Sequence, residues 1–358
     1  MLLKALRNWL IALGLCVQPL AAADFAGKTV TFIIPFAAGG GSDVWGRFDA
    51  QYLAKYLPGK PSVVIRNIPG GGSISGANLF AANAKGDGLT IFGTGGSTQF
   101  PYLLGLDSVK YEYRDWRVVL AAPTGGVTYV SKKLGINRLE DVPKLRGTKL
   151  YYASQGVTSL DLVPLLAFRM LGLDVSFVTG FPGRSEGLLA FEKGEMNVDF
   201  QTSAAYIRSA SGLVKNGDAL PLFSWGVLDS AGRLVRDPNF PDMPHFAEAY
   251  EKITGKQPSG IEWEALRAFL LAGFPAQKLI VLPKDTPDEV LETYRAAVRA
   301  MLKDEDYLAK RDAFIGEYEQ VTDQDAEALY KSAIDISPAA RAWVRKMLSE
   351  EHGISFAK

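Results

Sequence analysis

The stretch TVTFIIPFAAGGGSDVWGRF, residues 29–48, joins an apolar run to a glycine-rich turn and then to a segment of helical character. The opening run, 29–34, is short and rich in β-branched residues, which is typical of a buried parallel strand. A strand, a glycine turn and a helix start leave several backbone N–H groups unpaired at one end of a sheet, where the helix dipole favours an anion. This stretch therefore predicts an α/β unit whose turn, 35–43, can bind an anion without an arginine.

The same arrangement recurs further along the chain. SVVI at 62–65 precedes the turn NIPGGGSISG at 67–76, and LTIFGTGGSTQF at 89–100 carries a third strand with its own glycines. Successive strand, turn and helix units of this kind predict a parallel sheet with right-handed crossovers. Glycine can serve only to permit tight corners, but open α/β sheets bind ligands at the carboxyl ends of their strands. Two such turns at one sheet edge favour a ligand site.

A second α/β region starts after about residue 123. The segments 149–172 and 175–195 again combine a strand, a polar turn and a helix, and the last third of the chain has helical patterning that we assign to the scaffold. We therefore predict a two-lobed α/β protein in which each lobe is a mainly parallel sheet flanked by helices, with a hinge between the lobes. The predicted boundaries are 24–122 with 262–358 for the first lobe and 123–261 for the second.

The N-terminus has the pattern of a secretory signal peptide over residues 1–23. Lys4 and Arg7 precede an apolar stretch at 9–17, and three alanines end the segment at Ala23. The apolar stretch is too short to span a membrane. The only cysteine, Cys16, lies inside this segment, so we expect an exported mature protein without disulfides.

Composition disfavours several classes of function. Lys and Arg together number 39, as do Asp and Glu, so no global field indicates nucleic-acid binding. The only histidines are His245 and His352, which makes a metal centre improbable on ligand supply. Neither glycine turn continues into Gly-Lys-Ser/Thr, and Gly70, Gly72 and Gly76 miss the dinucleotide spacing by one residue. We expect no metal and no cofactor, which leaves a small carboxylate as the favoured anion.

One short motif suggests an alternative function. Gly183-Arg184-Ser185-Glu186-Gly187 fits the nucleophile-elbow pattern G-x-S-x-G and lies between a strand-like and a helix-like segment. A secreted serine hydrolase would then use Ser185 with His245 and with Asp199 or Asp242. No oxyanion motif of the HGGG type accompanies it. Ser185 could instead cap a helix.

The motifs in order resemble the substrate-binding proteins of tripartite tricarboxylate transporters, also called the Bug family of bacterial periplasmic receptors. The resemblance rests on PFAAGGGSD at 35–43 followed by Arg47, RNIPGGGSISG at 66–76, the GTGGS turn, YASQG at 152–156, and the stretches at 181–186 and before Asp199. It covers nearly the whole mature chain. It implies a periplasmic receptor, not an enzyme, that closes about a hinge on a small organic carboxylate. It also implies a monomer that delivers the ligand to integral membrane permease subunits, with no nucleic-acid partner.

The chain departs from the pattern of the family it resembles where the second lobe is expected to meet the ligand. FPGRSE at 181–186 replaces the usual Tyr-Lys-Gly motif, and 247–264 is an extra stretch. Arg184 could offer a bidentate fork to a second carboxylate or pair with Glu186. Asp43 suits helix capping better than contact with a carboxylate, and one serine or threonine of the 154–159 cluster should cap the next helix. The candidate ligand-binding residues are Phe36, Ala38, Gly39, Gly40, Gly41, Ser42, Asp43, Pro69, Gly70, Gly71, Gly72, Thr94, Gly95, Ser154, Gln155, Thr158, Ser159, Phe181, Arg184 and Asp199.

Overall fold

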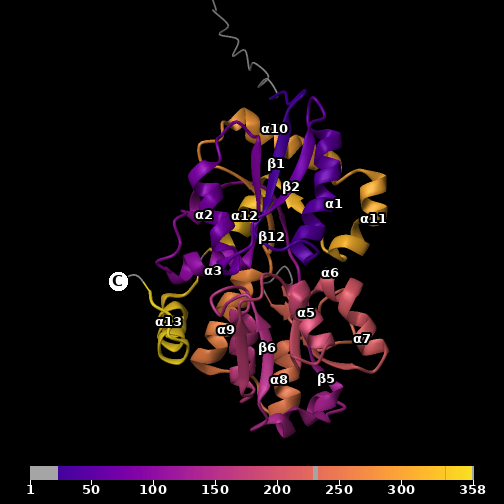
Figure 1. Ribbon diagram of the computed structural model, residues 1–358, viewed down its shortest axis with the longest axis vertical. Helices are drawn as coiled ribbons and strands as arrows, with labels where there is room; N and C mark the ends of the chain where they lie inside the picture. Colours follow the sequence, from indigo (N-terminus) through magenta and orange to yellow (C-terminus); the bar gives the residue numbers. More distant parts are fainter. Residues whose placement is uncertain (1–22, 229–232, 335, 357–358) are drawn as a thin grey trace, which may run out of the picture.

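The computed structural model describes residues 23–228, 233–334 and 336–356. Its helices and strands form two lobes that lie one above the other along the long axis of the molecule (Figure 1). Each lobe contains one mixed β-sheet flanked by helices. This confirms the predicted two-lobed α/β fold and refines it, because antiparallel strands complete both sheets.

The first lobe is built on a six-stranded sheet of order β13-β4-β12-β3-β1-β2. Strands β1, β2 and β3 are parallel, as the repeated glycine turns predicted, whereas β12 runs antiparallel between β3 and β4. Successive residues of β1 are buried on opposite faces of the sheet, Phe32 beside Trp45 and Ile33 beside Phe92. This two-sided burial explains the uninterrupted apolar run. The strands are β1 (Thr29–Ile34), β2 (Ser62–Asn67), β3 (Thr90–Thr94), β4 (Arg117–Ala122), β12 (Lys278–Leu282) and β13 (Val321–Thr322).

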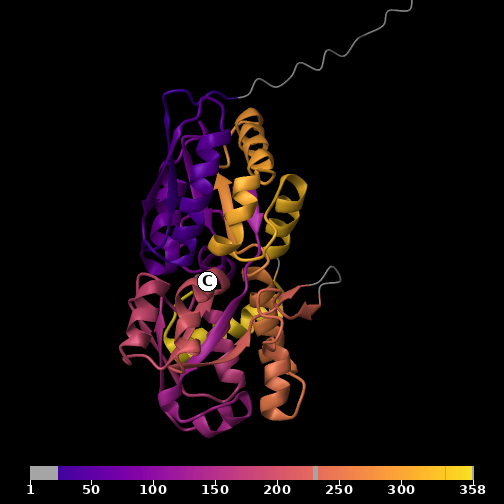
Figure 2. The same cartoon turned by 90° about the vertical axis from the view of Figure 1, so that its right-hand side faces the viewer.

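Helices from both ends of the sequence cover this sheet. Figure 2 shows the C-terminal helices, orange to yellow, beside the indigo N-terminal segments of the upper lobe. Tyr294 and Val298 of α10 share a core with Phe32 and Trp45. The helical segments are α1 (Gly41–Tyr56), η1 (Gly71–Ser73), α2 (Ile74–Asn83), α3 (Gly96–Leu104), η2 (Tyr113–Asp115), α10 (Asp288–Met301), α11 (Glu305–Ile315) and α12 (Asp323–Ala333).

The second lobe is built on a five-stranded sheet of order β7-β6-β8-β5-β9. Strand β6 is parallel to β7 and β8, and β5 is antiparallel to β8 and β9. The strands are β5 (Gly126–Ser131), β6 (Leu150–Ser154), β7 (Val175–Thr179), β8 (Val198–Thr202) and β9 (Ala219–Ser224), with a small hairpin of β10 (Val227–Leu228) and β11 (Leu234–Val235). The helical segments are η3 (Lys132–Leu134), η4 (Leu139–Leu145), α4 (Leu162–Met170), α5 (Arg184–Glu192), α6 (Ser203–Ala205), η5 (Tyr206–Ala210), α7 (Ser211–Lys215), α8 (Phe246–Thr254), α9 (Gly260–Gly273) and α13 (Pro338–His352).

The chain passes between the two sheets at residues 123–125, after β4, and at 274–277, before β12. The two crossings are bonded to each other, because the Thr124 N–H donates to the Phe274 carbonyl at 2.9 Å. Helices α9 and α13 share an apolar core with α4 of the second lobe and α3 of the first. The lobe boundaries given above remain a prediction.

The segment predicted as a signal peptide lies almost wholly in residues 1–22, outside the described part of the chain. Among the helices that the structure describes, none has the length and apolar character needed to cross a membrane.

Candidate functional site

A narrow cavity lies between the lobes, beyond the carboxyl end of β1. Its volume is about 30 Å³, which is room for roughly one or two water molecules. The start of α1 and the first residue of β12 form one wall, and the start of α5 forms part of the other. Its lining comprises Phe36, Ala37, Gly40, Gly41, Ser42, Ser97, Gln277 and Lys278 of the first lobe and Gln155, Leu160, Gly183, Arg184 and Thr202 of the second.

A wider cavity of about 400 Å³ adjoins the narrow one, and Phe36 and Gln155 line both. The second glycine turn forms one side of it, and the loop that follows β7 forms the other. Its remaining lining residues are Pro69, Gly70, Gly71, Gly72, Ser73, Gly180, Phe181 and Pro182. The two glycine turns therefore open onto neighbouring cavities that the second lobe covers.

The second lobe lies so close to both turns that side chains there would collide with it. A methyl group at Gly41 would lie 2.7 Å from the Thr202 hydroxyl, and one at Gly72 would lie 3.1 Å from the Ser159 Cβ. The lobes are also joined by a hydrogen bond from the Leu160 N–H to the Ser97 hydroxyl, 3.1 Å long. Glycine at these positions therefore lets the lobes meet, in addition to shaping the turns.

Asp43 holds the first glycine turn in shape. Its carboxylate accepts hydrogen bonds from the Gly39 N–H at 2.8 Å, from Arg47 at 2.9 Å and from Asn67 at 2.9 Å. Burial opposes ionisation of Asp43, but these hydrogen bonds outweigh it and lower the pKa of the carboxyl. Gly40 is the N-cap residue of α1 and Asp43 lies in its first turn. The prediction that Asp43 caps this helix was wrong: its carboxylate binds back to the turn.

The second glycine turn has a backbone that only glycine adopts readily. Gly70, Gly71 and Gly72 have φ values of +131°, +56° and +65°, and Ser73 follows at +102°. The Ser73 hydroxyl bonds to Thr98 at 2.9 Å, which ties the turn to α3. The turn is thus a fixed backbone surface facing the wider cavity.

Arg184 is buried in the second lobe with an acidic partner that sequence reasoning missed. Its guanidinium donates to the Asp161 carboxylate and, at 2.7 Å, to the Tyr152 hydroxyl, and it lies 4.4 Å from the centre of the Phe200 ring. Burial alone would lower the pKa of Arg184, but Asp161 and Tyr152 raise it. The expected pairing with Glu186 was wrong, because the partner is Asp161. Part of the donor fork is occupied, and contact of Arg184 with a ligand carboxylate remains a prediction.

The polar cluster at 154–159 serves mainly to shape its own loop. The Ser154 hydroxyl and the Gln155 N–H donate to Asp161 at 2.9 and 2.7 Å, and the buried Ser159 hydroxyl donates to the Gly156 carbonyl at 2.7 Å. Asp161, and no serine or threonine, occupies the N-cap position of α4. Gln155 is the member of this cluster that reaches both cavities.

Asp199 and Gly95 have structural surroundings. Asp199 is buried in β8, where it accepts hydrogen bonds from Tyr129 and, at 2.9 Å, from Gln201. Burial raises its pKa to about 6 against the opposing effect of these bonds. A methyl group at Gly95 would lie 2.0 Å from the Gln277 carbonyl oxygen. Gly95 thus permits the close approach of the crossing that leads into β12.

Lys278 is a site residue that the sequence did not reveal. It is 7% exposed at the start of β12, and its ammonium group donates to the Ser42 hydroxyl at 2.9 Å. Burial, assisted by Arg184, lowers the pKa of Lys278 to about 7. Its only sequence signal is a lysine before the apolar run LIVL, a pattern equally typical of an exposed strand end.

The cavities bring together eleven of the twenty predicted ligand-binding residues, and their roles as ligand contacts remain predictions. Those that line a cavity are Phe36, Gly40, Gly41, Ser42, Pro69, Gly70, Gly71, Gly72, Gln155, Phe181 and Arg184. Those outside the described lining are Ala38, Gly39, Asp43, Thr94, Gly95, Ser154, Thr158, Ser159 and Asp199.

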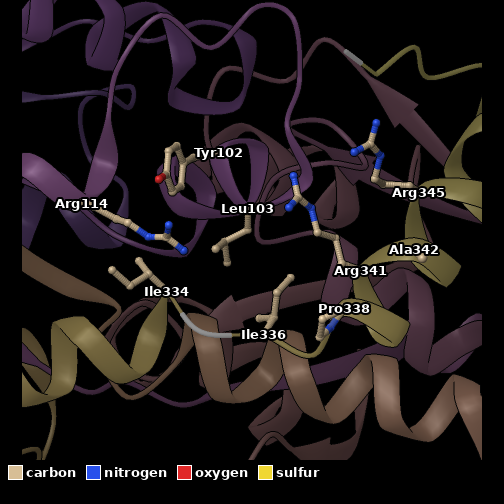
Figure 3. Close-up of a pocket in the computed structure, with 9 residues that line it drawn as sticks. All are labelled: Tyr102, Leu103, Arg114, Ile334, Ile336, Pro338, Arg341, Ala342 and Arg345. Carbon is tan, nitrogen blue, oxygen red and sulfur yellow. The ribbon is translucent and has the colours of Figure 1, made fainter. Parts of the chain in front are cut away.

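A further cavity of about 610 Å³ lies away from the glycine turns. Figure 3 shows Arg341 and Arg345 of α13 on one side of it and Arg114 with Tyr102 on the other. None of the predicted site residues lines it. We assign it no part in the candidate site.

The arrangement around Ser185 does not support a hydrolase. Gly183 is the N-cap residue of α5 and Ser185 lies in the first turn, so the capping role predicted for Ser185 was also wrong. His245 caps α8, where its Nδ1 accepts from the Glu248 N–H. Among the hydrogen bonds between described residues, none links Ser185 to His245 or to Asp199.

Two α/β lobes that face each other across a cavity form the fold of periplasmic binding proteins, and comparison with solved structures agrees on this fold. The periplasmic binding protein BugD is similar, with a TM-score of 0.68 and 18% identity over 92% of this chain and 99% of that one. MatC from Rhodopseudomonas palustris with bound malate has a TM-score of 0.64 and 20% identity over 85% and 96%. An R. palustris protein solved with adipate has a TM-score of 0.66 and 20% identity over 93% and 99%.

At the level of sequence, a UPF0065 protein of Bordetella pertussis is 27% identical over 303 residues, which cover 81% of this chain and 81% of that protein. No protein-family model matches the chain. The sequence relative and the fold together confirm the resemblance to periplasmic receptors of the Bug type.

Proposed function

We propose that the chain is a periplasmic substrate-binding receptor, not an enzyme, that captures a small organic carboxylate between its lobes. The observation that carries this proposal is the pair of glycine turns opening onto adjoining cavities that the second lobe covers. Turns of this kind offer backbone N–H groups and the positive end of a helix to an anion. Lys278 and Arg184 add cationic side chains to the narrow cavity.

The ligands of similar proteins support the same class of substrate. MatC was solved with malate and an R. palustris protein with adipate. Both are dicarboxylates, and both structures share the fold of this chain. We extend this ligand class, though neither particular ligand, to the present protein.

The proposal includes the predicted export and delivery steps. The N-terminal pattern predicts secretion to the periplasm, and the family resemblance implies that the loaded receptor passes its ligand to integral membrane permease subunits. We propose that the chain acts there as a monomer whose lobes separate to admit the ligand, bending at the crossings 123–125 and 274–277 and at the link from α12 to α13.

A thermal-shift panel tests the proposal directly. The mature protein is mixed with malate, adipate, citrate and benzoate, and with hexane-1,6-diol as a control that keeps the length of adipate but lacks its charges. A ligand at 100 times its dissociation constant should add ~2.7 kcal/mol to the free energy of unfolding. Stabilisation by at least one acid and none by the diol is expected. A flat response to every acid, repeated by calorimetry, would contradict the proposal.

A further inference from the structure

Lys278 is a buried cation without a carboxylate partner. Its side chain is 7% exposed and donates to the Ser42 hydroxyl at 2.9 Å. None of the ion pairs found within residues 23–228, 233–334 and 336–356 includes Lys278. Removing an ammonium group from water is costly unless an opposite charge or a full set of hydrogen bonds replaces the water. Whenever Lys278 is protonated, the isolated protein therefore holds a charge in the narrow cavity that no opposite charge compensates.

Among the described residues no carboxylate pairs with Lys278, although the Glu186 carboxylate lies behind Gly183 in the opposite wall. Its partner across the sheet, Ala122, is not titratable, and neither is Thr94, which pairs with the next residue, Leu279. Tyr318 lines a further small cavity together with Lys278, and its hydroxyl donates a hydrogen bond to Asp237. From the second lobe the group that shares the cavity is Arg184, a second cation, whose charge Asp161 already balances. Lys278 and Arg184 are thus the charged side chains that line this cavity.

A second unpaired polar group lies in the same wall. Gln277 is 5% exposed and lines the narrow cavity, and its Oε1 is buried without a hydrogen-bond partner among the described residues. A buried amide oxygen without a hydrogen-bond donor destabilises the protein until a donor binds to it. At the entry to β12, the Gln277 oxygen thus lacks a hydrogen-bond donor, and the Lys278 ammonium group, bonded to the Ser42 hydroxyl, lacks an opposite charge.

We infer that Lys278 is the counter-charge for one carboxylate of the ligand, which enters the narrow cavity and binds to the Lys278 ammonium group, the Ser42 hydroxyl and the first glycine turn. This inference rests on the proposed function and assigns a residue and a ligand shape to it. With the lobes placed as they are here, a cavity of about 30 Å³ matches a carboxylate group better than a ring. The rest of the ligand must pass Phe36 and Gln155 into the wider cavity of about 400 Å³. The favoured ligand is an elongated dicarboxylate without a bulky substituent beside its first carboxylate.

Proton uptake on binding is a consequence that can be measured. In the free protein, burial and Arg184 lower the pKa of Lys278 to about 7, so a fraction of the molecules carry a neutral amine near that pH. A bound carboxylate favours the charged form and raises the pKa again. Binding should therefore take up protons at pH 7–8 and take up none well below pH 6, where Lys278 is already charged. Affinity should fall as the pH rises above 7.

Calorimetry of the mature protein with adipate tests the inference. Titrations at pH 6, 7 and 8, each in two buffers of different ionisation enthalpy, give the number of protons bound. Lys278→Met keeps the apolar stem, and Lys284→Met is the matched control, since Lys284 lies two residues beyond β12 with a side chain that is 72% exposed. We expect Lys278→Met to weaken binding by about 10- to 100-fold and to abolish the uptake. Lys284→Met should change neither.

The possible outcomes distinguish the inference about Lys278 from the proposed function. If the wild type binds adipate or malate but Lys278→Met binds equally well, or if the wild type takes up no protons at pH 7–8, the inference about Lys278 is wrong and the proposed function stands. If the wild type binds no member of the carboxylate panel, the proposed function itself is wrong. The uptake measurement uses the wild type, so it decides even if Lys278→Met fails to fold.

Discussion

Asp161 lines neither cavity, yet it determines the conformation of second-lobe residues that do. It is fully buried and accepts hydrogen bonds from Tyr152, Ser154, the Gln155 N–H and Arg184. The same carboxylate therefore fixes the loop that carries Gln155 and also the side chain of Arg184. We therefore expect ligand contacts on this side to depend on a residue that the ligand does not touch.

Asp161→Asn should destabilise the protein strongly, because it leaves the buried Arg184 guanidinium without its counter-charge. Loss of one member of a buried pair costs ~3–5 kcal/mol in the free energy of unfolding. Urea unfolding of Asp161→Asn, Arg184→Met and the double variant provides the measurement, and the double variant should lose much less than the two single losses combined. Arg236→Ala, at an exposed pair with Glu248, is the control and should have little effect. Additive losses would contradict coupling between Asp161 and Arg184.

Asp49 should make the stability depend on pH in an unusual direction. It is fully buried, and burial raises its pKa to about 8 although Tyr307, Trp45 and Gln320 oppose the shift. The folded state then holds a proton that the unfolded state releases above about pH 4, so stability should fall as the pH rises from 5 to 8. Asp199, with a pKa of about 6, adds to the same trend at the acidic end.

Asp49→Asn should remove most of this dependence, since the amide has no proton to lose. Urea midpoints at pH 5, 6.5 and 8 provide the test. The variant should gain stability relative to the wild type as the pH rises. Parallel curves for the two proteins would show that Asp49 titrates normally.

Turn η1 offers a matched pair of glycines that separates backbone strain from contact between the lobes. Gly71 and Gly72 have similar φ values of +56° and +65°, so alanine strains the backbone comparably at either site. Only the alanine at 72 would press on the second lobe, 3.1 Å from Ser159 and 3.2 Å from the Gln155 carbonyl oxygen. Gly72→Ala should therefore hinder closure, whereas Gly71→Ala should not.

Both variants should lose roughly 1–2 kcal/mol of stability. Gly72→Ala should also weaken adipate binding by about tenfold or more, a figure that corresponds to 1.4 kcal/mol of hindered closure. Calorimetry measures the affinities, and small-angle scattering with and without adipate measures compaction. Equal affinities for the two variants would place the ligand-bound lobes further apart at this turn than they are here.

Elements whose partners are close in sequence were predictable, and those with distant partners were not. The runs 29–34, 62–65 and 89–94 identified three parallel strands because each is short, rich in β-branched residues and followed by a glycine turn. Nothing local in KLIVL indicates that it inserts between β3 and β4. Lys278 was missed for that reason. Asp161 was missed because a carboxylate seven residues after Ser154 gives no sign of the buried arginine it meets.

The site could be predicted in outline because its glycine turns are local features. Gly40 to Ser42 and Pro69 to Gly72 line the cavities as expected. The polar residues of the second lobe were the harder part. Their hydrogen bonds turn Ser154 and Ser159 inward and leave Gln155 facing the ligand space, and this choice depends on Asp161 and not on sequence spacing.

At the scale of the whole molecule, Tyr318 secures the crossing at 123–125. Its hydroxyl accepts from the Gly125 N–H at 2.8 Å, bonds to Ser203 at 2.6 Å and donates to Asp237. The tyrosine follows α11 of the first lobe, while Gly125 and Ser203 flank strands of the second. One buried hydroxyl therefore joins the two lobes at the proposed hinge.

Tyr318→Phe should leave the Gly125 N–H and Asp237 with one partner fewer, at a cost of roughly 1–3 kcal/mol. Hydrogen exchange should accelerate at residues 123–126 in particular. Tyr330→Phe is the control, because the Tyr330 hydroxyl bonds to the Tyr113 carbonyl within the first lobe. It should lower stability without this local acceleration. Identical exchange patterns in the two variants would argue against a hinge role for Tyr318.

In the loops of the second lobe, one set of residues maintains the loop structure and another set faces the cavity. This separation allows the ligand specificity to be changed. Ser154, Ser159 and the Asp161 pair are turned into the lobe, where substitution would unfold the loop. Gln155, Phe181 and Pro182 face the wider cavity and carry little of that network. A combinatorial library confined to these three positions would retarget the protein toward other acids while the bare backbone of the first lobe continued to hold the common carboxylate. After a gene duplication, substitutions at the same three positions would change the ligand specificity and leave the loop structure intact.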